Sequence, residues 1–359
     1  MMTDRRRIAG RIAGVAAGLL LTAGVEAAEP TVIEQKIGGL TALADWVQAD
    51  DAEPGAPVVL LLHGTLADKD QELIDALQEL LAERGISSLA PSLTLGVDRR
   101  TGPYDCNDPF HHTPEEAVDE LAAWADWLKA GGHPRIVLSG HSRGGNQVAL
   151  FARAHPATIE KLIPIASAVG HSDDVRDQRY KARYGASRTD VLASAEGRTG
   201  LIDVPGIVYC RDAKATPAAI RSYLGGSFDD HDTPSVIARL SMPVMVIAGS
   251  VDTTVPELPE RMAAIADGQR VRLEMIDDAD HFFLDFYAED AADLMAEFSA
   301  DEAVVGGSAF AGPRPPAHSR TGRGGVPRPS VMPPHSNSIA SNTRPALRVA
   351  SSSKVCRWA

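Results

Sequence analysis

The sequence predicts an α/β fold in which a mainly parallel sheet has helices on both faces and carries a cap insertion. Short continuous apolar segments, such as 58–63, are typical of strands that are buried on both faces of a parallel sheet. Segments with helical periodicity alternate with these strands along the chain. Residues 169–240 interrupt the alternation and contain no clear strand of the kind that flanks them. We expect them to form a cap over a site at the carboxyl edge of the sheet.

The first half of the chain contains two predicted strand–helix units. The strand at 58–63 precedes a helix whose apolar stripe ends just before Gly85, and glycine is common directly after a helix. A second strand is predicted at 86–92. A helix is expected to begin at Thr113 and Pro114, because threonine is a favourable N-cap and proline fits the first helical position.

The second half continues the alternation on both sides of the predicted cap. A strand at 136–139 is followed by a helix at 144–154, and a strand at 162–166 precedes the cap. After the cap we expect strands at 244–249 and 271–276, a helix at 257–266 and a terminal helix at 283–298. In that last helix, Phe286, Tyr287, Leu294 and Met295 are predicted to face inward.

Composition and charge exclude several classes of protein. The chain has 359 residues, 44% hydrophobic and 23% charged, which excludes a collagen, a coiled coil and a wholly disordered protein. The formal net charge of −13 argues against binding to nucleic acid, because phosphate binding needs a basic surface. Residues 28–302 hold 23 basic and 46 acidic residues, whereas residues 303–359 hold 8 basic and no acidic ones. We expect 303–359, which are also rich in Pro and Ser, to be a disordered tail outside the folded body at 28–302.

Residues 1–27 have the layout of a secretory signal peptide. Arginines at positions 5 to 7 precede an apolar stretch, and Val25 and Ala27 stand at the −3 and −1 positions of a signal-peptidase site. A membrane anchor is the alternative, but this stretch is shorter than the ~20 residues that a spanning helix needs. We therefore expect an exported protein, periplasmic or secreted, without a membrane span after processing.

Two cysteines of the body can form a disulfide in such an oxidising compartment. Cys106 and Cys210 lie within the body, and Cys356 lies in the tail. A disulfide between Cys106 and Cys210 and a pair of buried free thiols are both compatible with the sequence, because the sequence does not determine their separation.

A G-x-S-x-G motif occurs at residues 140–144. It directly follows the strand predicted at 136–139 and precedes a helix. In this context Gly140 and Gly144 relieve crowding at a sharp turn that presents the hydroxyl of Ser142 at the edge of the sheet. Ser142 is therefore the candidate nucleophile, and a merely structural glycine-rich loop is the alternative.

A serine nucleophile needs a base that takes its proton and an acid that orients the base. Asp252 follows the strand at 244–249, and a strand end can fix a carboxylate, so Asp252 is the candidate acid. His281 follows the last predicted strand and is the candidate base. The competing residues are Asp173, Asp174, Asp277, Asp278 and Asp280 for the acid and His231, His111 and His112 for the base.

With these residues the body resembles the α/β-hydrolase superfamily over about residues 30–300, in particular its serine esterases and lipases. The matching pieces are His63-Gly64-Thr65 after the first buried strand, the turn at 140–144, Asp252 and His281, in the chain order Ser, Asp, His. The resemblance implies an oxyanion hole built from the backbone N–H groups of Thr65 and Arg143. We expect His63 and His141 to be structural.

The sequence therefore predicts an exported serine hydrolase that cleaves a carboxylic ester of a small-molecule substrate through an acyl-enzyme on Ser142. Thioester or peptide hydrolysis and acyl transfer would use the same three residues, and a binding protein without turnover is a further alternative. This chemistry requires no cofactor. No metal-ligand spacing is recognised either, because His111 and His112 are adjacent and would point in different directions.

Overall fold

The computed structural model describes residues 30–301, and an eight-stranded sheet lies at its centre. The strands run in the order β1-β2-β4-β3-β5-β6-β9-β10, and the pairs from β4 to β10 are parallel. Every residue of β3 and β5 is buried, as expected for central strands covered on both faces. The strand bounds are β1 Thr31–Ile37, β2 Leu40–Val47, β3 Val58–Leu62, β4 Ser88–Ser92, β5 Ile136–His141, β6 Lys161–Ile165, β9 Val244–Gly249 and β10 Val271–Ile276.

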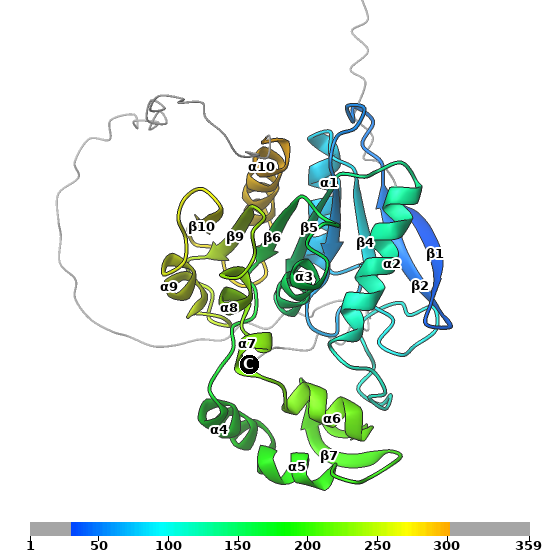
Figure 1. Cartoon of the computed structure of the whole chain (residues 1–359), viewed down its shortest axis with the longest axis vertical. Coiled ribbons are helices and arrows are strands. Elements are labelled where there is room, and N and C mark those ends of the chain that lie inside the picture. The colour runs from blue at the N-terminus through cyan, green and yellow to red at the C-terminus, as the bar shows by residue number, and fades with distance from the viewer. Residues whose placement is uncertain (1–29, 302–359) are drawn as a thin grey trace, which may run out of the picture. The chain divides into compact units, whose positions relative to one another are not determined.

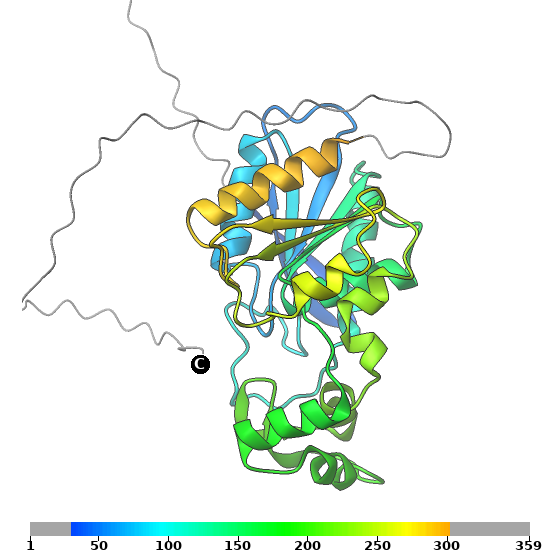
Figure 2. The ribbon, with the colours of Figure 1, turned by 90° about the vertical axis from the view of Figure 1, so that its left-hand side faces the viewer.

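Helices cover both faces of this sheet, which confirms the predicted α/β fold class. Figure 2 shows α1 and α10 on one side of the sheet and α3, α8 and α9 on the other. The packing of α1 on α10 and of α3 on α2 and α8 agrees with these two layers. The bounds are α1 Glu72–Glu83, α2 Glu116–Ala130, α3 Arg143–Ala154, α8 Thr233–Ile237, α9 Leu258–Ala263 and α10 Phe286–Ala300.

The segment between β6 and α8 forms the remaining elements, which we call the insertion. Figure 1 shows α4, α5, α6 and β7 grouped together, apart from the sheet. The segment also contains two short strands that were not predicted, β7 and β8, which form an antiparallel hairpin separate from the main sheet. The β8 sequence CRDAKA places charged residues on its exposed face, so it lacks the apolar run of the central strands. The bounds are α4 Asp173–Tyr184, α5 Arg188–Ser194, β7 Ile202–Ile207, β8 Cys210–Ala215, α6 Pro217–Leu224 and α7 Phe228–His231.

Three further details differ from the sequence-based expectations. The antiparallel strands β1 and β2 at one sheet edge were not predicted, and β1 has the alternating exposure of an edge strand rather than an apolar run. α2 begins at Glu116 instead of Thr113. α10 begins after Asp285, so Phe283 is buried ahead of the helix, while Phe286, which was expected to face inward, is 81% exposed.

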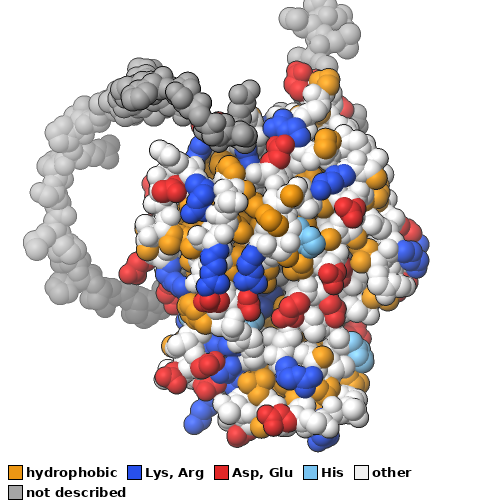
Figure 3. Space-filling model, in the orientation of Figure 1, with side chains coloured by type: hydrophobic (Ala, Val, Ile, Leu, Met, Phe, Trp, Pro, Cys, Tyr) orange, Lys and Arg blue, Asp and Glu red, His pale blue; other side chains and the backbone are white. Residues whose placement is uncertain are grey.

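The surface of the described residues is mixed in character. Figure 3 shows basic, acidic and apolar side chains interspersed on the face that it presents. Among residues 30–301, no helix is both long enough and apolar enough to cross a membrane. The signal peptide predicted at 1–27 and the tail predicted at 303–359 lie outside the described residues.

Candidate active site

Ser142 occupies the turn between β5 and α3 in a backbone conformation that serine rarely adopts. Its φ is 55° and its ψ is −118°. The turn is held by two backbone hydrogen bonds, from Ser142 N–H to the carbonyl of Ile165 at 2.9 Å and from Ala168 N–H to the carbonyl of Ser142 at 3.0 Å. Strained residues of this kind persist where the surrounding structure determines them, and they are common at active sites.

Gly140 and Gly144 leave no room for a side chain at this turn. A Cβ atom at Gly140 would lie 2.6 Å from the carbonyl oxygen of Gly144, and one at Gly144 would lie 2.3 Å from the carbonyl oxygen of His63. Both separations are far below van der Waals contact. The two glycines therefore allow α3 to begin directly against β5 and the loop after β3, which is the packing that presents Ser142.

The structure brings Ser142, His281 and Asp252 together in one hydrogen-bonded series. His281 Nε2 lies 3.0 Å from Ser142 Oγ, and His281 Nδ1 lies 2.8 Å from Asp252 Oδ2. All three side chains belong to residues that are at least nine-tenths buried. Because the Asp252 carboxylate accepts from Nδ1–H, the Nε2 lone pair faces the serine hydroxyl. This is the geometry in which a histidine can remove the proton of a serine nucleophile.

The carboxylate of Asp252 is stabilised in its charged form. Burial alone would raise its pKa, but the hydrogen bond and charge of His281 outweigh burial, so the pKa of Asp252 lies below its ordinary value. Asp252 Oδ1 also accepts the backbone N–H groups of Thr254 at 2.7 Å and Val255 at 3.1 Å. One carboxylate oxygen thus fixes the side chain while the other orients the imidazole.

The competing acids have other partners. Asp173, at the start of α4, pairs with Arg188 inside the insertion at 2.8 Å. Asp280 precedes His281 in sequence, but its carboxylate accepts the backbone N–H of Phe282. Asp174, Asp277 and Asp278 likewise have no hydrogen bond to His281 within residues 30–301.

The competing histidines also lie apart from the serine hydroxyl. His231, in the insertion, contacts the carbonyl of Gly225 at 3.1 Å. His112 Nδ1 lies 2.9 Å from the hydroxyl of Tyr223. Burial lowers the pKa of His112 to about 3, so its ring is neutral near pH 7. Neither these two nor His111 has a hydrogen bond to Ser142 in the described part of the chain.

Two backbone N–H groups, those of Thr65 and Arg143, have no acceptor among the described residues. Thr65 lies in the loop after β3, and Arg143 is the first residue of α3, where backbone N–H groups lack helical partners. Within residues 30–301, neither N–H group donates a hydrogen bond. These are the two groups that the sequence resemblance implied for an oxyanion hole.

His63 and His141 flank these loops as buried, neutral rings. His63 Nε2 accepts the N–H of Leu93 at 3.1 Å, and burial together with the nearby Arg100 lowers its pKa to about 3. His141 lies between the carbonyl of His281 and the side chain of Gln71. The sequence analysis overlooked Gln71. Its position at a helix start near the His63-Gly64 motif is the only signal that could have pointed to it.

The insertion is attached to the sheet domain close to Ser142. Cys106, in the loop between β4 and α2, forms a disulfide with Cys210 of β8. The same loop pairs with β8 through Phe110 and Ala215. In α6, the ring of Tyr223 lies 5.8 Å from the guanidinium carbon of Arg143, the residue that follows Ser142. The insertion therefore contacts the residue next to Ser142.

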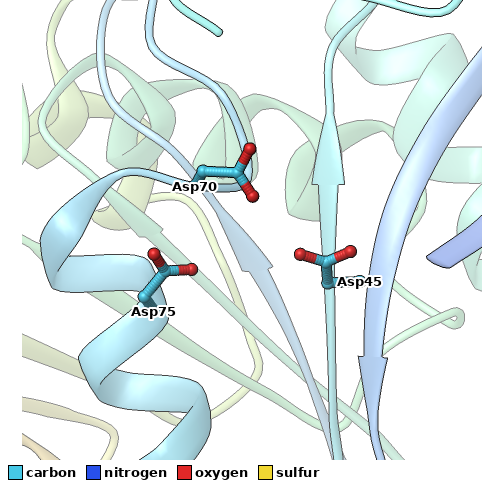
Figure 4. A group of neighbouring side chains, drawn as sticks. All are labelled: Asp45, Asp70 and Asp75. Carbon is cyan, nitrogen blue, oxygen red and sulfur yellow. The ribbon is translucent and has the colours of Figure 1, made fainter. Parts of the chain in front are cut away.

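A second polar cluster lies beside the sheet and contains three carboxylates, those of Asp45, Asp70 and Asp75 (Figure 4). Their nearest oxygens all lie within 4.8 Å of one another, a spacing that could hold a cation. The ammonium group of Lys69 bonds to Asp45 at 2.7 Å and also to Asp70, so it already supplies a positive charge. The cluster contains none of the residues of the Ser142–His281–Asp252 series.

Comparison with known proteins identifies similarities in family and fold. A model of the alpha/beta hydrolase family matches residues 59–298. A curated rice protein (Oryza sativa subsp. japonica), named a probable 1-acylglycerol-3-phosphate O-acyltransferase, is 22% identical over 189 residues, or 53% of this chain and only 44% of that protein.

Two solved structures illustrate the similarity in fold. Est1E from Butyrivibrio proteoclasticus, solved with ferulic acid bound, has a TM-score of 0.54 and 20% identity over 74% of this chain and 97% of its own. The proline iminopeptidase of Mycobacterium smegmatis has a TM-score of 0.52 and 19% identity over 75% and 97% of the two chains.

Proposed function

The chain belongs to the alpha/beta hydrolase family, and on that premise we propose that it is a serine hydrolase that cleaves carboxylic esters. The observation that carries this proposal is the hydrogen-bonded series of Ser142, His281 and Asp252. A non-catalytic scaffold would not need a buried serine at a strained φ with a histidine aligned on its hydroxyl.

In the proposed reaction, Ser142 Oγ attacks the ester carbonyl carbon while His281 Nε2 takes the hydroxyl proton. The carbonyl oxygen becomes an oxyanion that accepts hydrogen bonds from the N–H groups of Thr65 and Arg143. The C–O bond then breaks, His281 returns the proton to the leaving alkoxide, and an alcohol departs. Water attacks the remaining acyl-enzyme with His281 as base, which releases the carboxylic acid and restores Ser142.

The proposal includes export of the enzyme to an oxidising compartment. The disulfide between Cys106 and Cys210 supports this, because such bonds persist in secreted and periplasmic proteins and are rare in the cytosol. Fractionation of cells that express the full chain tests it. Accumulation in the cytosol with both thiols free would contradict export.

Acyl transfer to an alcohol is the second candidate function. The name of the rice relative supports it, and an acyl-enzyme on Ser142 can react with an alcohol as well as with water. Product analysis with glycerol present distinguishes the two reactions. A glycerol ester as the main product indicates transfer, and free acid indicates hydrolysis.

The Ser142→Ala variant tests the proposed nucleophile. We expect it to lose at least about 10³-fold in kcat on p-nitrophenyl acetate and to lose labelling by a fluorophosphonate probe, because no other group can form the acyl-enzyme. Its circular dichroism and Tm should match those of the wild type, since only a hydroxyl is removed. Activity within tenfold of the wild type would contradict the assignment.

A further inference from the structure

A polar bridge connects the loop after β3 with the loop that carries His281, and Gln71 is its central residue. The backbone N–H of Gly64 donates to Gln71 Oε1 at 2.6 Å. Gln71 Nε2 lies 2.9 Å from His141 Nδ1, and His141 Nε2 lies 2.8 Å from the carbonyl oxygen of His281. One end of the bridge is therefore next to the N–H of Thr65, and the other end is the backbone of the proposed base.

The directions of these hydrogen bonds follow from the chemistry of the groups. The N–H of Gly64 can only donate, so it faces the oxygen of Gln71, and the amide nitrogen of Gln71 faces His141. This nitrogen donates to Nδ1, which places the proton of the neutral His141 ring on Nε2, where it is donated to the His281 carbonyl. Burial and the nearby His281 lower the pKa of His141 to about 3, so the ring is neutral at pH 7.

Gln71 stands at the N-cap of α1, but its side chain does not cap the helix. The usual N-cap residues, Ser, Thr, Asp and Asn, accept a backbone N–H with their side chains. Gln71 makes no such bond, and its backbone carbonyl accepts the N–H groups of Ile74 at 2.7 Å and Asp75 at 3.0 Å. Its backbone is thus fixed by the helix, while its side-chain amide is used entirely in the bridge.

We infer that Gln71 is a positioning residue for the reaction, an inference that rests on the proposed function. Its amide links the loop that contains Thr65 to the loop that contains His281, and His281 contacts Ser142. Thr65 stabilises the oxyanion and His281 moves the proton, so both must be aligned at the same moment in the transition state. A loosened bridge therefore slows the chemical step and leaves ester binding unchanged.

The Gln71→Met variant tests this role, with Gln78→Met as its matched control. Methionine is close in size to glutamine and makes no strong hydrogen bond. Gln78 lies two turns further along α1, is 3% exposed and donates to the carbonyl of Asp45 and to Ser88 Oγ, both at 3.2 Å. Both variants thus remove the hydrogen bonds of a glutamine of the same helix, but Gln78 has no contact with the bridge.

We expect Gln71→Met to lower kcat on p-nitrophenyl acetate by about 10- to 100-fold with KM within twofold of the wild type. Gln78→Met should keep kcat within twofold of the wild type, although its Tm should fall at least as far as that of Gln71→Met. A kcat of Gln71→Met within twofold of the wild type would overturn the inference, and so would equal losses of kcat in the two variants.

A second measurement follows the bridge independently of turnover. The ¹⁵N NMR spectrum of histidine-labelled protein should show His141 as the Nε2–H form with a hydrogen-bonded Nδ1, and that Nδ1 signal should shift in Gln71→Met but not in Gln78→Met. An unchanged signal in Gln71→Met would overturn the bridge. If the wild type neither cleaves the ester nor reacts with the fluorophosphonate, the proposed function fails, and this spectrum still decides whether the bridge exists.

Discussion

The carboxyl edge of the sheet and the insertion above it are stabilised by different kinds of contacts. At the edge, Ser142 and the backbone of His281 are held by neutral hydrogen bonds between buried groups, to the Ile165 carbonyl and from the His141 ring. These hydrogen bonds are short and are shielded from water. Neutral buried hydrogen bonds are costly to break, so this region has one arrangement.

The insertion combines a small apolar core of its own with ion pairs that reach the solvent. Arg188 pairs with Asp173 and Asp177, whose side chains are 76% and 42% exposed. Because these carboxylates are exposed, salt weakens the two pairs, although Arg188 itself is buried. The disulfide between Cys106 and Cys210 adds a covalent attachment to the sheet domain. The two regions therefore differ in how their contacts meet the solvent: those beside Ser142 are shielded from water, whereas the ion pairs of the insertion are partly exposed to it.

The largest expected effect is the loss of kcat in Asp252→Asn, a change at the carboxyl edge. The amide oxygen of Asn stays with the N–H groups of Thr254 and Val255, so its NH2 group faces His281 Nδ1 and favours the wrong tautomer of the ring. The amide also carries no negative charge to stabilise the imidazolium, so kcat should fall about 10³- to 10⁴-fold. Asp280→Asn is the matched control, because Asp280 is adjacent to His281 but has no contact with its ring. We expect steady-state kinetics of the control to match the wild type. Equal losses in both variants would show that Asp252 is not specifically required.

Removal of the disulfide that attaches the insertion should have the opposite pattern, a loss of stability with little change in kcat. The double variant Cys106→Ser, Cys210→Ser removes a crosslink between positions 104 residues apart and should lower the free energy of unfolding by about 2–5 kcal/mol. The kcat for p-nitrophenyl acetate should change less than threefold, because neither cysteine touches Ser142 or His281. Urea denaturation and steady-state kinetics measure both quantities, with Cys356→Ser as the control. A large loss of kcat in a folded double variant would show that the disulfide of the insertion also affects the site at the carboxyl edge.

The smallest expected effect concerns Asp75, in the polar cluster shown in Figure 4. Burial and the neighbouring Asp70 and Asp45 raise its pKa to about 6, above the ordinary 3.8. The folded state therefore keeps a proton that the unfolded state releases, and stability falls as pH rises from about 4 to 6. Asp75→Asn should remove this loss.

The gain for Asp75→Asn relative to the wild type should be roughly 1 kcal/mol at pH 7.5 and absent at pH 3.5, because the exposed side chain is screened by solvent. Thermal unfolding of both proteins across this pH range measures the difference. The same gain at both pH values would show that Asp75 does not titrate near 6. Activity at pH 7.5 should be unchanged, since among the described residues the carboxylate of Asp75 has no hydrogen bond to Gln71 or to the Ser142–His281–Asp252 series.

The features that could be predicted from sequence are those with a local signal. Ser142 stands in a five-residue motif, and Asp252 and His281 each follow a predicted strand. The carboxyl ends of parallel strands lie at the same edge of a sheet, so these three residues are expected to lie close together. The strands β3 and β5 can also be predicted, because their sequences contain the short apolar runs VVLLL and IVL that fully buried strands need. Each of these signals lies within about ten residues of the feature that it indicates.

The features that could not be predicted depend on contacts between distant segments. Gln71 meets His141 across 70 positions, and nothing in the sequence near either residue indicates the other. Phe286 was misplaced because α10 begins three residues later than its periodicity indicates, and Phe283 takes the buried position. The strand β8 was overlooked because a hairpin packed on one face needs no apolar run.

The position of Asp252 and His281 after the last two strands has a consequence for the newly made chain. The turn that contains Ser142 is synthesised first, and a chain that ends before β9 at Val244 has a nucleophile but no base. If the proposed function holds, the serine becomes reactive only when β9 and β10 have joined the sheet. Emergence of reactivity toward a fluorophosphonate during synthesis would report completion of the fold, and unfinished chains would not attack esters on their way out of the ribosome.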